Sequence, residues 1–294
     1  MERKTLRVAV ISVHGCPLAR LGEKDTGGMN VYLLQLAREL GLRGLQMDVY
    51  TRYHDPADPQ VVKLSENARV IHIKAGRWGE TKGNIYPHLP EFIRNLCRFV
   101  KANDLRYDLV HSHYWLSGRV ALALKKHLSV PFIASFHTLG EAKRRVLPRE
   151  REPEVRIETE KKIMEDADSI IALSTEDKKQ MIGLYEASSF KIEVIPSGVD
   201  LNFFKPLEQR AARSELGLKD AKTILFVGRI EPIKGIDLLL KTIPYIDCRE
   251  RPRLIIVGGD GGGNGEITRL REIVGQLGIE GDVTFTGTVS QERL

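Results

Sequence analysis

Short apolar runs rich in β-branched residues alternate along the whole chain with stretches in which apolar residues recur at helical spacing. The runs predict strands at Arg7–Val13, Met47–Thr51, Val70–Ile73, Leu109–Ser112, Phe132–Ser135, Ser169–Leu173, Glu193–Ile195, Thr223–Val227, Arg253–Val257 and Val283–Thr286. Several runs are almost continuously apolar, as expected of central parallel strands that are covered on both faces. Val31–Leu40 is typical of the helices between them, and Gly41 and Gly44 lie just past its end. This alternation predicts an α/β fold with doubly wound parallel sheets.

The pattern restarts after residue 205, which indicates two domains. Pro196–Asp200 forms a turn, a short helix is expected over Glu208–Leu216, and the strand at Thr223–Val227 opens a second α/β unit. We therefore expect Rossmann-like domains over residues 1–205 and 206–294. The second has only three predicted strands and stops where Ser290 looks like the N-cap of another helix. The sequence predicts that this second domain is truncated at its C-terminus.

Composition narrows the class of protein without naming a function. The 294 residues carry a net charge of +6, with 42% hydrophobic and 29% charged residues, which is an ordinary globular balance. The excess of basic residues is too dilute to indicate nucleic acid. No apolar run approaches twenty residues, and the three cysteines are too few and too scattered for a disulfide framework or a zinc cluster. We expect a cytoplasmic protein.

Two glycine-containing turns after strands are candidates for phosphate binding. Gly27 and Gly28 open a helix, where free N–H groups and the helix dipole suit a phosphate, although tight packing would explain the glycines equally well. In the second domain, Gly228 and Arg229 follow a strand and Lys234 precedes the next helix, as a diphosphate site would require. The alternative is that these two cations are ordinary surface charges. Neither turn has the spacing of a dinucleotide-binding or Walker A motif.

Three histidines lie at the ends of predicted strands in the first domain. His111 and His113 share one face of a strand, so a metal pair is conceivable, but no third ligand is suitably spaced and we predict no metal. His137 is a candidate polar group over a sugar or a phosphate, or a structural histidine. Residues 141–162 hold eight basic and six acidic residues. They indicate a solvated loop and an exposed helix, unless some of the arginines face a cleft.

Seven short motifs in order along the chain resemble the retaining glycosyltransferases of family 4, which have the GT-B fold of two Rossmann-like domains. The closest branch contains sucrose-phosphate synthases, sucrose synthases and D-inositol 3-phosphate glycosyltransferases. The motifs are His14-Gly-Cys-Pro-Leu18, Gly27-Gly-Met-Asn-Val-Tyr32, His111-Ser-His-Tyr-Trp-Leu-Ser-Gly118, His137-Thr-Leu139, Pro196-Ser-Gly-Val-Asp200, Val227-Gly-Arg229 with Lys234-Gly235, and Phe285-Thr-Gly287.

The resemblance implies a role for each candidate residue. Arg229 and Lys234, with Gly228, would bind the diphosphate of a nucleotide sugar, and Gly27 and Gly28 would lie beside it. His137 would contact the transferred hexose. The residues implied on the acceptor side are His14 and Asn30, and those implied for an acceptor phosphate are Lys82, Tyr114, Thr138 and Arg156.

The resemblance therefore implies a hexosyltransferase that uses a nucleotide sugar, with a UDP-sugar as the expected donor, and a phosphorylated sugar or polyol as acceptor. No cofactor or metal is required, no nucleic acid partner is expected, and a membrane partner through the basic segment 143–151 is disfavoured. Family members carry, beyond the region matched by these motifs, a Glu-x7-Glu stretch near a Phe-Gly-Leu segment. No Phe-Gly-Leu counterpart occurs in this sequence, so we expect little or no activity from residues 1–294. The alternatives are a nucleotide-sugar epimerase or hydrolase of the same fold, and a non-catalytic sugar-phosphate-binding module.

Overall fold

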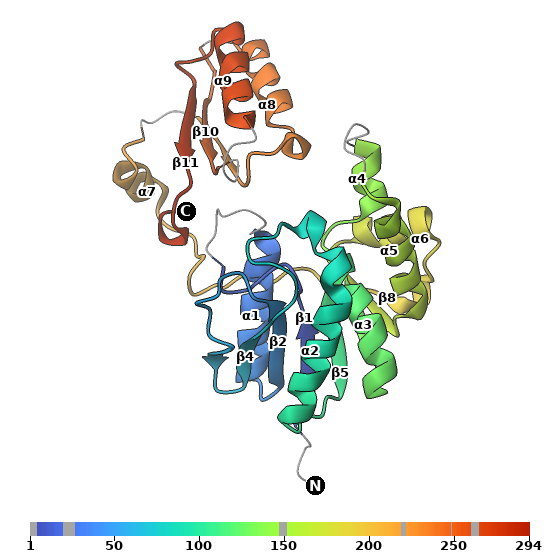
Figure 1. Ribbon diagram of the computed structural model, residues 1–294. Coiled ribbons are helices and arrows are strands. Elements are labelled where there is room, and N and C mark those ends of the chain that lie inside the picture. Colours follow the sequence, from blue (N-terminus) through green and yellow to red (C-terminus); the bar gives the residue numbers. More distant parts are fainter. Residues whose placement is uncertain (1–4, 20–26, 147–151, 219–221, 248, 260–264) are drawn as a thin grey trace. The chain divides into compact units, whose positions relative to one another are not determined.

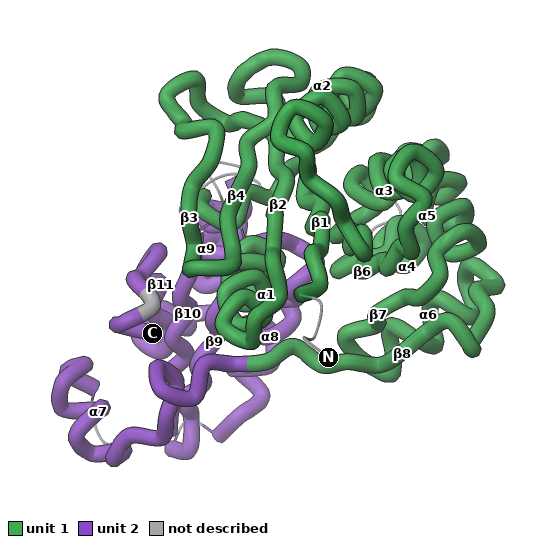
Figure 2. The backbone as a smooth tube through the Cα atoms, turned by 90° about the horizontal axis from the view of Figure 1, so that it is seen from below, with its two compact units in different colours: residues 1–19, 25–198 green, residues 20–24, 199–294 purple. Residues whose placement is uncertain are grey.

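The computed structural model (Figure 1) describes residues 5–19, 27–146, 152–218, 222–247, 249–259 and 265–294. Within them the chain forms two compact units, coloured separately in Figure 2. The larger unit contains the described residues up to Gly198, and the smaller contains those from Val199 onward. The chain thus leaves the first unit inside the predicted turn Pro196–Asp200.

The larger unit is built on one sheet of eight strands in the order β3-β4-β2-β1-β5-β6-β7-β8. All neighbouring strands run parallel except β3 and β4. The strands are β1 (Arg7–Ile11), β2 (Gln46–Arg52), β3 (Val61–Ser65), β4 (Ala68–Ile73), β5 (Leu109–His113), β6 (Phe132–Ser135), β7 (Ser169–Ala172) and β8 (Ile192–Val194). The predicted α/β class with parallel sheets is confirmed.

Helices cover both faces of this sheet. They are α1 (Gly28–Leu42), α2 (Leu89–Ala102), α3 (Trp115–Leu128), α4 (Gly140–Val146), α5 (Glu154–Asp166) and α6 (Thr175–Tyr185). Alternate residues of β1 point to opposite faces: Ala9 and Ile11 pack into the core beneath α2 and α3, whereas Val8 and Val10 pack against α1. In Figure 2, α1 and α2 accordingly lie on opposite sides of the strands.

Helices α3 and α5 approach each other closely because α3 carries a glycine at the contact. A Cβ atom on Gly118 would lie 2.4 Å from Cδ1 of Ile163, and both residues are buried. This close contact matters for the site, because Tyr114 caps the start of α3 and Arg156 lies in the first turn of α5.

The smaller unit has a parallel sheet in the order β11-β10-β9. Its elements are α7 (Gln209–Glu215), β9 (Thr223–Val227), α8 (Ile236–Thr242), β10 (Arg253–Val257), α9 (Glu266–Leu277) and β11 (Val283–Gly287). Its core includes Leu240 from α8, Leu254 and Ile256 from β10, and Leu270 from α9. The helix expected to begin at Ser290 is only a 3-10 turn over Gln291–Arg293.

Local structure differs from the sequence-based expectations at two further places. Strand β3 was missed: Val61 and Lys63 are exposed, so this edge strand lacks the apolar run that marks the central strands, and it pairs antiparallel to β4 through a turn at Glu66 and Asn67. The helix expected to be exposed within residues 141–162 has a buried face, because Arg156 in α5 is only 3% exposed. Residues 147–151 of that segment lie outside the described residues.

Candidate functional site

The carboxyl ends of β1, β5 and β6 bring several predicted residues together. The strand order reverses direction between β1 and β5, and open α/β sheets bind ligands outside the strands at such a point. His14 follows β1, Tyr114 follows β5, and their ring centroids are 4.6 Å apart. His137 and Thr138 follow β6. This edge of the sheet is therefore the candidate site of the larger unit.

Three histidines and one tyrosine form an aromatic cluster at this edge. Nδ1 of His113 lies 2.9 Å from Nε2 of His137, so one of these nitrogens donates and the other accepts. The ring of Tyr32, from α1, lies 5.3 Å from the His137 ring and 5.8 Å from the His113 ring. His111 contacts Ser135 Oγ through its Nε2 at 3.0 Å. The cluster fixes the orientation of His137.

Burial keeps these imidazoles neutral at physiological pH. It lowers the pKa of His137 to about 4 and that of His111 to about 3, and it lowers the pKa of His113 well below its ordinary value. His113 Nε2 is buried and has no hydrogen-bond partner among the described residues. Because a buried N–H without an acceptor is costly, the favoured tautomer has His113 Nδ1–H donating to His137 Nε2. His137 then carries its proton on Nδ1.

Arg156 contacts two of the other residues predicted to bind an acceptor phosphate, Tyr114 and Thr138. Its guanidinium carbon lies 5.0 Å from the centroid of the Tyr114 ring, and its Nη2 donates to the carbonyl and hydroxyl oxygens of Thr138 at 3.1 and 3.2 Å. The side chain of Arg156 is only 3% exposed, so its position is fixed by these contacts and by two carboxylates. Tyr114, Thr138 and Arg156 therefore form one structural group.

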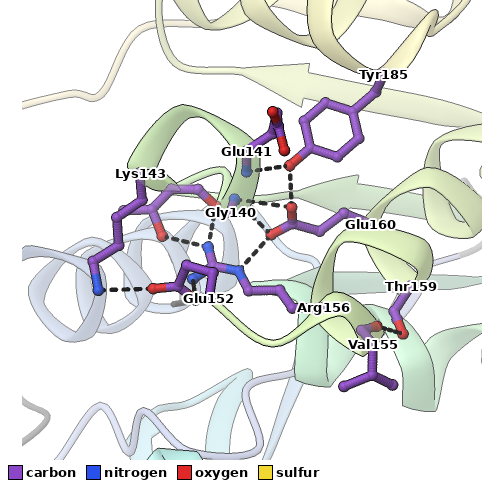
Figure 3. Close-up of polar contacts among 10 residues, drawn as sticks. Gly140, Glu141, Lys143, Glu152, Val155, Arg156, Thr159, Glu160 and Tyr185 are labelled. Carbon is purple, nitrogen blue, oxygen red and sulfur yellow. Dashed lines mark hydrogen bonds and ion pairs between the residues drawn. The ribbon is translucent and has the colours of Figure 1, made fainter. Parts of the chain in front are cut away.

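The two carboxylates differ in how they are held (Figure 3). Glu160 is fully buried and accepts hydrogen bonds from Arg156 Nε at 2.8 Å, from the Gly140 N–H at 2.9 and 3.2 Å, and from the Tyr185 hydroxyl. Four converging donor contacts suit an ionised carboxylate, which only accepts. Burial raises the pKa of Glu160, while Arg156 and Tyr185 oppose this shift.

Glu152 lies just before α5 and bridges two cations. Its carboxylate is 2.8 Å from Nη1 of Arg156 and 2.7 Å from Nζ of Lys143. Burial alone would raise the pKa of this carboxyl group, but the hydrogen bonds from Lys143 and Arg156 outweigh it and lower the pKa. Glu152 is therefore ionised at neutral pH.

Two of the candidate residues hold their backbone in the left-handed region. Tyr114 has φ 75° and ψ 158°, a conformation that glycine adopts far more readily than tyrosine, and His137 has φ 62°. Such strain persists only where the surroundings over-determine it, and it is common at binding sites. Here this backbone conformation places the Tyr114 side chain next to His14 and the His137 side chain next to His113, at the candidate site.

The start of α1 combines an exposed glycine with a buried asparagine. Apart from its chain neighbours and the backbone of its own helix, no atom of the described residues lies within 4 Å of a Cβ built on Gly28, so packing against other elements does not explain this glycine. Asn30 is buried: its Oδ1 accepts from the Gly27 N–H at 3.2 Å, and its Nδ2 donates to the Cys16 carbonyl at 2.7 Å. Asn30 thus ties the loop after β1 to this helix, and its implied contact with an acceptor stays a prediction.

Lys82, the fourth residue implied for the phosphate, is exposed in a 3-10 turn over Lys82–Asn84. The loop before this turn is fastened by Arg52, a buried residue at the end of β2 that the sequence analysis did not single out. Its guanidinium donates to the carbonyls of Arg77 at 2.7 Å and Glu80 at 3.0 Å.

The cationic residues of the smaller unit lie after β9. The Gly228 N–H donates to the Val257 carbonyl at 3.0 Å, so this turn is bonded to the end of β10. Arg229 is partly exposed and pairs with Glu231 at 3.1 Å. Lys234 is exposed in a 3-10 turn that ends at Gly235, whose φ of 66° favours glycine. Residues 260–264 of the predicted glycine loop lie outside the described residues.

The structure adds residues that sequence reasoning missed. Tyr32, Glu152 and Glu160 each contact a predicted site residue, and Lys143 pairs with Glu152. The signal that could have revealed the two glutamates is their spacing of four residues on either side of Arg156. In the described part of the chain, no group of three or more His, Cys, Asp or Glu side chains is placed to hold a metal ion.

Two α/β units built on parallel sheets match the architecture of the GT-B class of glycosyltransferases. The profile described as Glycosyltransferase Family 4 matches residues 26–203, and that described as Glycosyl transferases group 1 matches residues 208–294. The chain belongs to glycosyltransferase family 4, which confirms the resemblance seen in the sequence.

Relatives and solved structures agree with this assignment. The chain is 38% identical over 305 residues to D-inositol 3-phosphate glycosyltransferase 2 of Catenulispora acidiphila, in a match that covers 100% of this chain and 71% of the relative. It is 31% identical to the sucrose-phosphate synthase structure from Thermosynechococcus elongatus, with a TM-score of 0.87, covering 98% of this chain and 71% of that one. HepE of Anabaena, solved with UDP and glucose, shares the fold at 17% identity and a TM-score of 0.69, covering 97% and 70% of the two chains.

Among the described helices, none combines the length and the apolar character that crossing a bilayer requires.

Proposed function

We propose that this protein transfers a hexose from a nucleotide sugar, with a UDP-sugar as the expected donor, to a phosphorylated sugar or polyol with retention of configuration. The observation that carries the proposal is the group formed by Tyr114, Thr138 and Arg156. A guanidinium that is already oriented by a ring and a hydroxyl is well suited to a phosphate monoester. The names of two relatives, which specify D-inositol 3-phosphate and sucrose phosphate, support an acceptor of this class.

We assign other candidate residues of the larger unit to the transferred hexose, the donor phosphates and the acceptor. His137 stays neutral because burial lowers its pKa to about 4, so it would orient a hexose hydroxyl by hydrogen bonding rather than act as a cationic acid. Gly28 starts a helix of fifteen residues and leaves open space beside its backbone, as a bound phosphate would need. His14 contacts Tyr114 and is assigned to the acceptor.

In the smaller unit, we assign the donor diphosphate to Arg229 and Lys234, with Gly228. Their positive charges would stabilise the leaving nucleoside diphosphate as the glycosidic bond breaks. In a front-face substitution, this leaving group takes the proton of the acceptor hydroxyl while the new bond forms on the same face, which retains the configuration. The protein contributes mostly positioning and electrostatic stabilisation, and this scheme assigns no step to a metal ion.

Lys234→Ala in the active enzyme tests the second half of this scheme. The side chain is exposed, so the thermal unfolding midpoint should move by no more than about 1 °C. Loss of one such electrostatic group typically lowers turnover by about 10²–10³-fold. Unchanged turnover in a steady-state transfer assay would count against the assignment.

Calorimetry on residues 1–294 tests the acceptor class without requiring turnover. We expect D-myo-inositol 3-phosphate or fructose 6-phosphate to bind at least about tenfold more tightly than the unphosphorylated compound, the effect of one charge-assisted contact. Thr138→Val removes a hydroxyl from an exposed side chain and should reduce that preference without unfolding the protein. Equal affinity for phosphorylated and unphosphorylated compounds would refute the proposed acceptor.

A transfer assay with the active enzyme separates the alternatives. A transferase consumes the nucleotide sugar only when the phosphorylated acceptor is present. An epimerase or hydrolase consumes it without an acceptor, and a binding module consumes none.

A further inference from the structure

The site proposed for the acceptor phosphate already contains a negative charge supplied by the protein. Glu152 bridges Nη1 of Arg156 and Nζ of Lys143 at 2.8 and 2.7 Å, and its side chain is 11% exposed. A carboxylate shared by a guanidinium and an ammonium uses the same donors as an oxygen of a phosphate monoester. Figure 3 shows Glu152 between these two cations.

The second carboxylate on Arg156 has a different place in the fold. Glu160 lies within α5, is fully buried, and also bonds Gly140 and Tyr185, so it cannot leave without breaking four donor contacts. Glu152 precedes the first residue of α5, and its carboxylate pairs with the side chains of Lys143 and Arg156. Moving Glu152 aside therefore breaks no helical hydrogen bond, and Glu160 continues to orient the guanidinium.

Charge balance indicates why Glu152 would have to move. Arg156 and Lys143 bring two positive charges, and Glu160 and Glu152 bring two negative charges, so the four groups are neutral together. A phosphate dianion approaching this neutral group finds its donors occupied. Once Glu152 is displaced, one positive charge is in excess, and Nη1 of Arg156 and Nζ of Lys143 lose their carboxylate partner.

We propose that Glu152 is an internal competitor of the acceptor phosphate, occupying the Arg156 site when no acceptor is bound and setting how tightly phosphate monoesters bind. The inference rests on the proposed function, in which Arg156 binds the acceptor phosphate. It makes Glu152 a specificity-determining residue, because only a dianion that replaces the carboxylate on both cations gains from the exchange. A neutral polyol gains nothing from it.

The matched pair Glu152→Gln and Glu154→Gln tests this inference in the chain of residues 1–294. Both substitutions remove one negative charge near the start of α5, but Glu154 is 68% exposed and pairs with Arg144 at 3.2 Å. Affinities for D-myo-inositol 3-phosphate, inorganic phosphate and unphosphorylated myo-inositol are measured by calorimetry at constant ionic strength. Thermal unfolding shows that each variant is folded.

We expect Glu152→Gln to bind both phosphate compounds about tenfold more tightly than the wild type, the effect of freeing one charge-assisted contact. Glu154→Gln should stay within about twofold, because exposed charges contribute little. If Glu152→Gln binds the phosphates equally or more weakly while the wild type binds them, Glu152 only orients Arg156, and this inference fails while the proposed function stands. If neither protein binds any phosphate compound, the inference and the proposed acceptor class fail together.

Discussion

Gly118→Ala places one extra methyl group between α3 and α5, where the packing leaves no room for it. The new Cβ would lie 2.4 Å from Cδ1, 3.0 Å from Cγ1 and 3.4 Å from Cγ2 of Ile163. Carbon atoms pack best at about 3.5–4.0 Å, so the two helices must separate or Ile163 must leave its rotamer. Both residues are fully buried, which leaves no solvent-exposed direction in which the strain can relax.

The size and sign of the effect follow from two opposing terms. Alanine is favoured over glycine within a helix by about 1 kcal/mol, which alone would stabilise the protein. Overpacking a dense core costs about 1–3 kcal/mol and is greatest where the contact is shortest. We expect the overpacking to win, with a net loss of about 1–2 kcal/mol in the free energy of unfolding. Gly183→Ala in α6 is the matched control, because no described atom lies within 4 Å of its Cβ, and it should stabilise the protein.

Urea unfolding followed by tryptophan fluorescence measures the stability of the larger unit, which contains Gly118. Both tryptophans of the chain, Trp78 and Trp115, belong to the larger unit. Ile163→Val removes the methyl group nearest to the new Cβ, so the double variant should be at least about 1 kcal/mol more stable than the sum of the single effects predicts. A Gly118→Ala protein that is as stable as the Gly183→Ala control would refute the reasoning.

Two further predictions concern the histidines and Gly28 at the candidate site of the larger unit. The free energy of unfolding should fall as the pH drops from about 6.5 towards 4. Burial lowers the pKa of His111 to about 3 and that of His137 to about 4, so in this pH range the unfolded chain binds more protons than the folded one. Each of the two histidines contributes up to about 1.4 kcal/mol per pH unit to this loss. Urea unfolding at pH 7.5, 6 and 5 measures this slope. His137→Asn, which tolerates a φ of 62°, should reduce the slope, and an unchanged slope would contradict this explanation. Gly28→Ala should leave the thermal midpoint unchanged or raise it, yet weaken UDP binding at least about tenfold by calorimetry; undiminished binding would contradict the donor assignment.

Much of the fold could be predicted from the sequence because the central strands are marked by their own composition. Runs such as Arg253–Val257 are apolar along their length, and the structure places β10 at those residues. Strand β3 was not predicted, because an edge strand is half exposed and its residues need not be apolar. Tyr114 and Thr138 lie within two of the motifs, and the family resemblance implied Arg156.

The charged segment before and within α5 could not be interpreted in the same way. Glu152, Arg156 and Glu160 look like an ordinary exposed series of alternating charges. Their burial depends on groups that are distant in the chain: the Thr138 oxygens, the Gly140 N–H and the Tyr185 hydroxyl. Nothing local to α5 indicates that these partners will be present.

The sequence by itself determined the alternation of strands and helices, the α/β class and the family, because these depend on local hydrophobic patterns and short motifs. Only the tertiary structure decided which ionisable groups are buried and how they are paired. The reason is physical: a charge is buried at acceptable cost only when its partners come within hydrogen-bond distance, and those partners come from separate elements. The local pattern around Arg156 is a run of alternating charges, whereas the fold buries its side chain between Glu152 and Glu160.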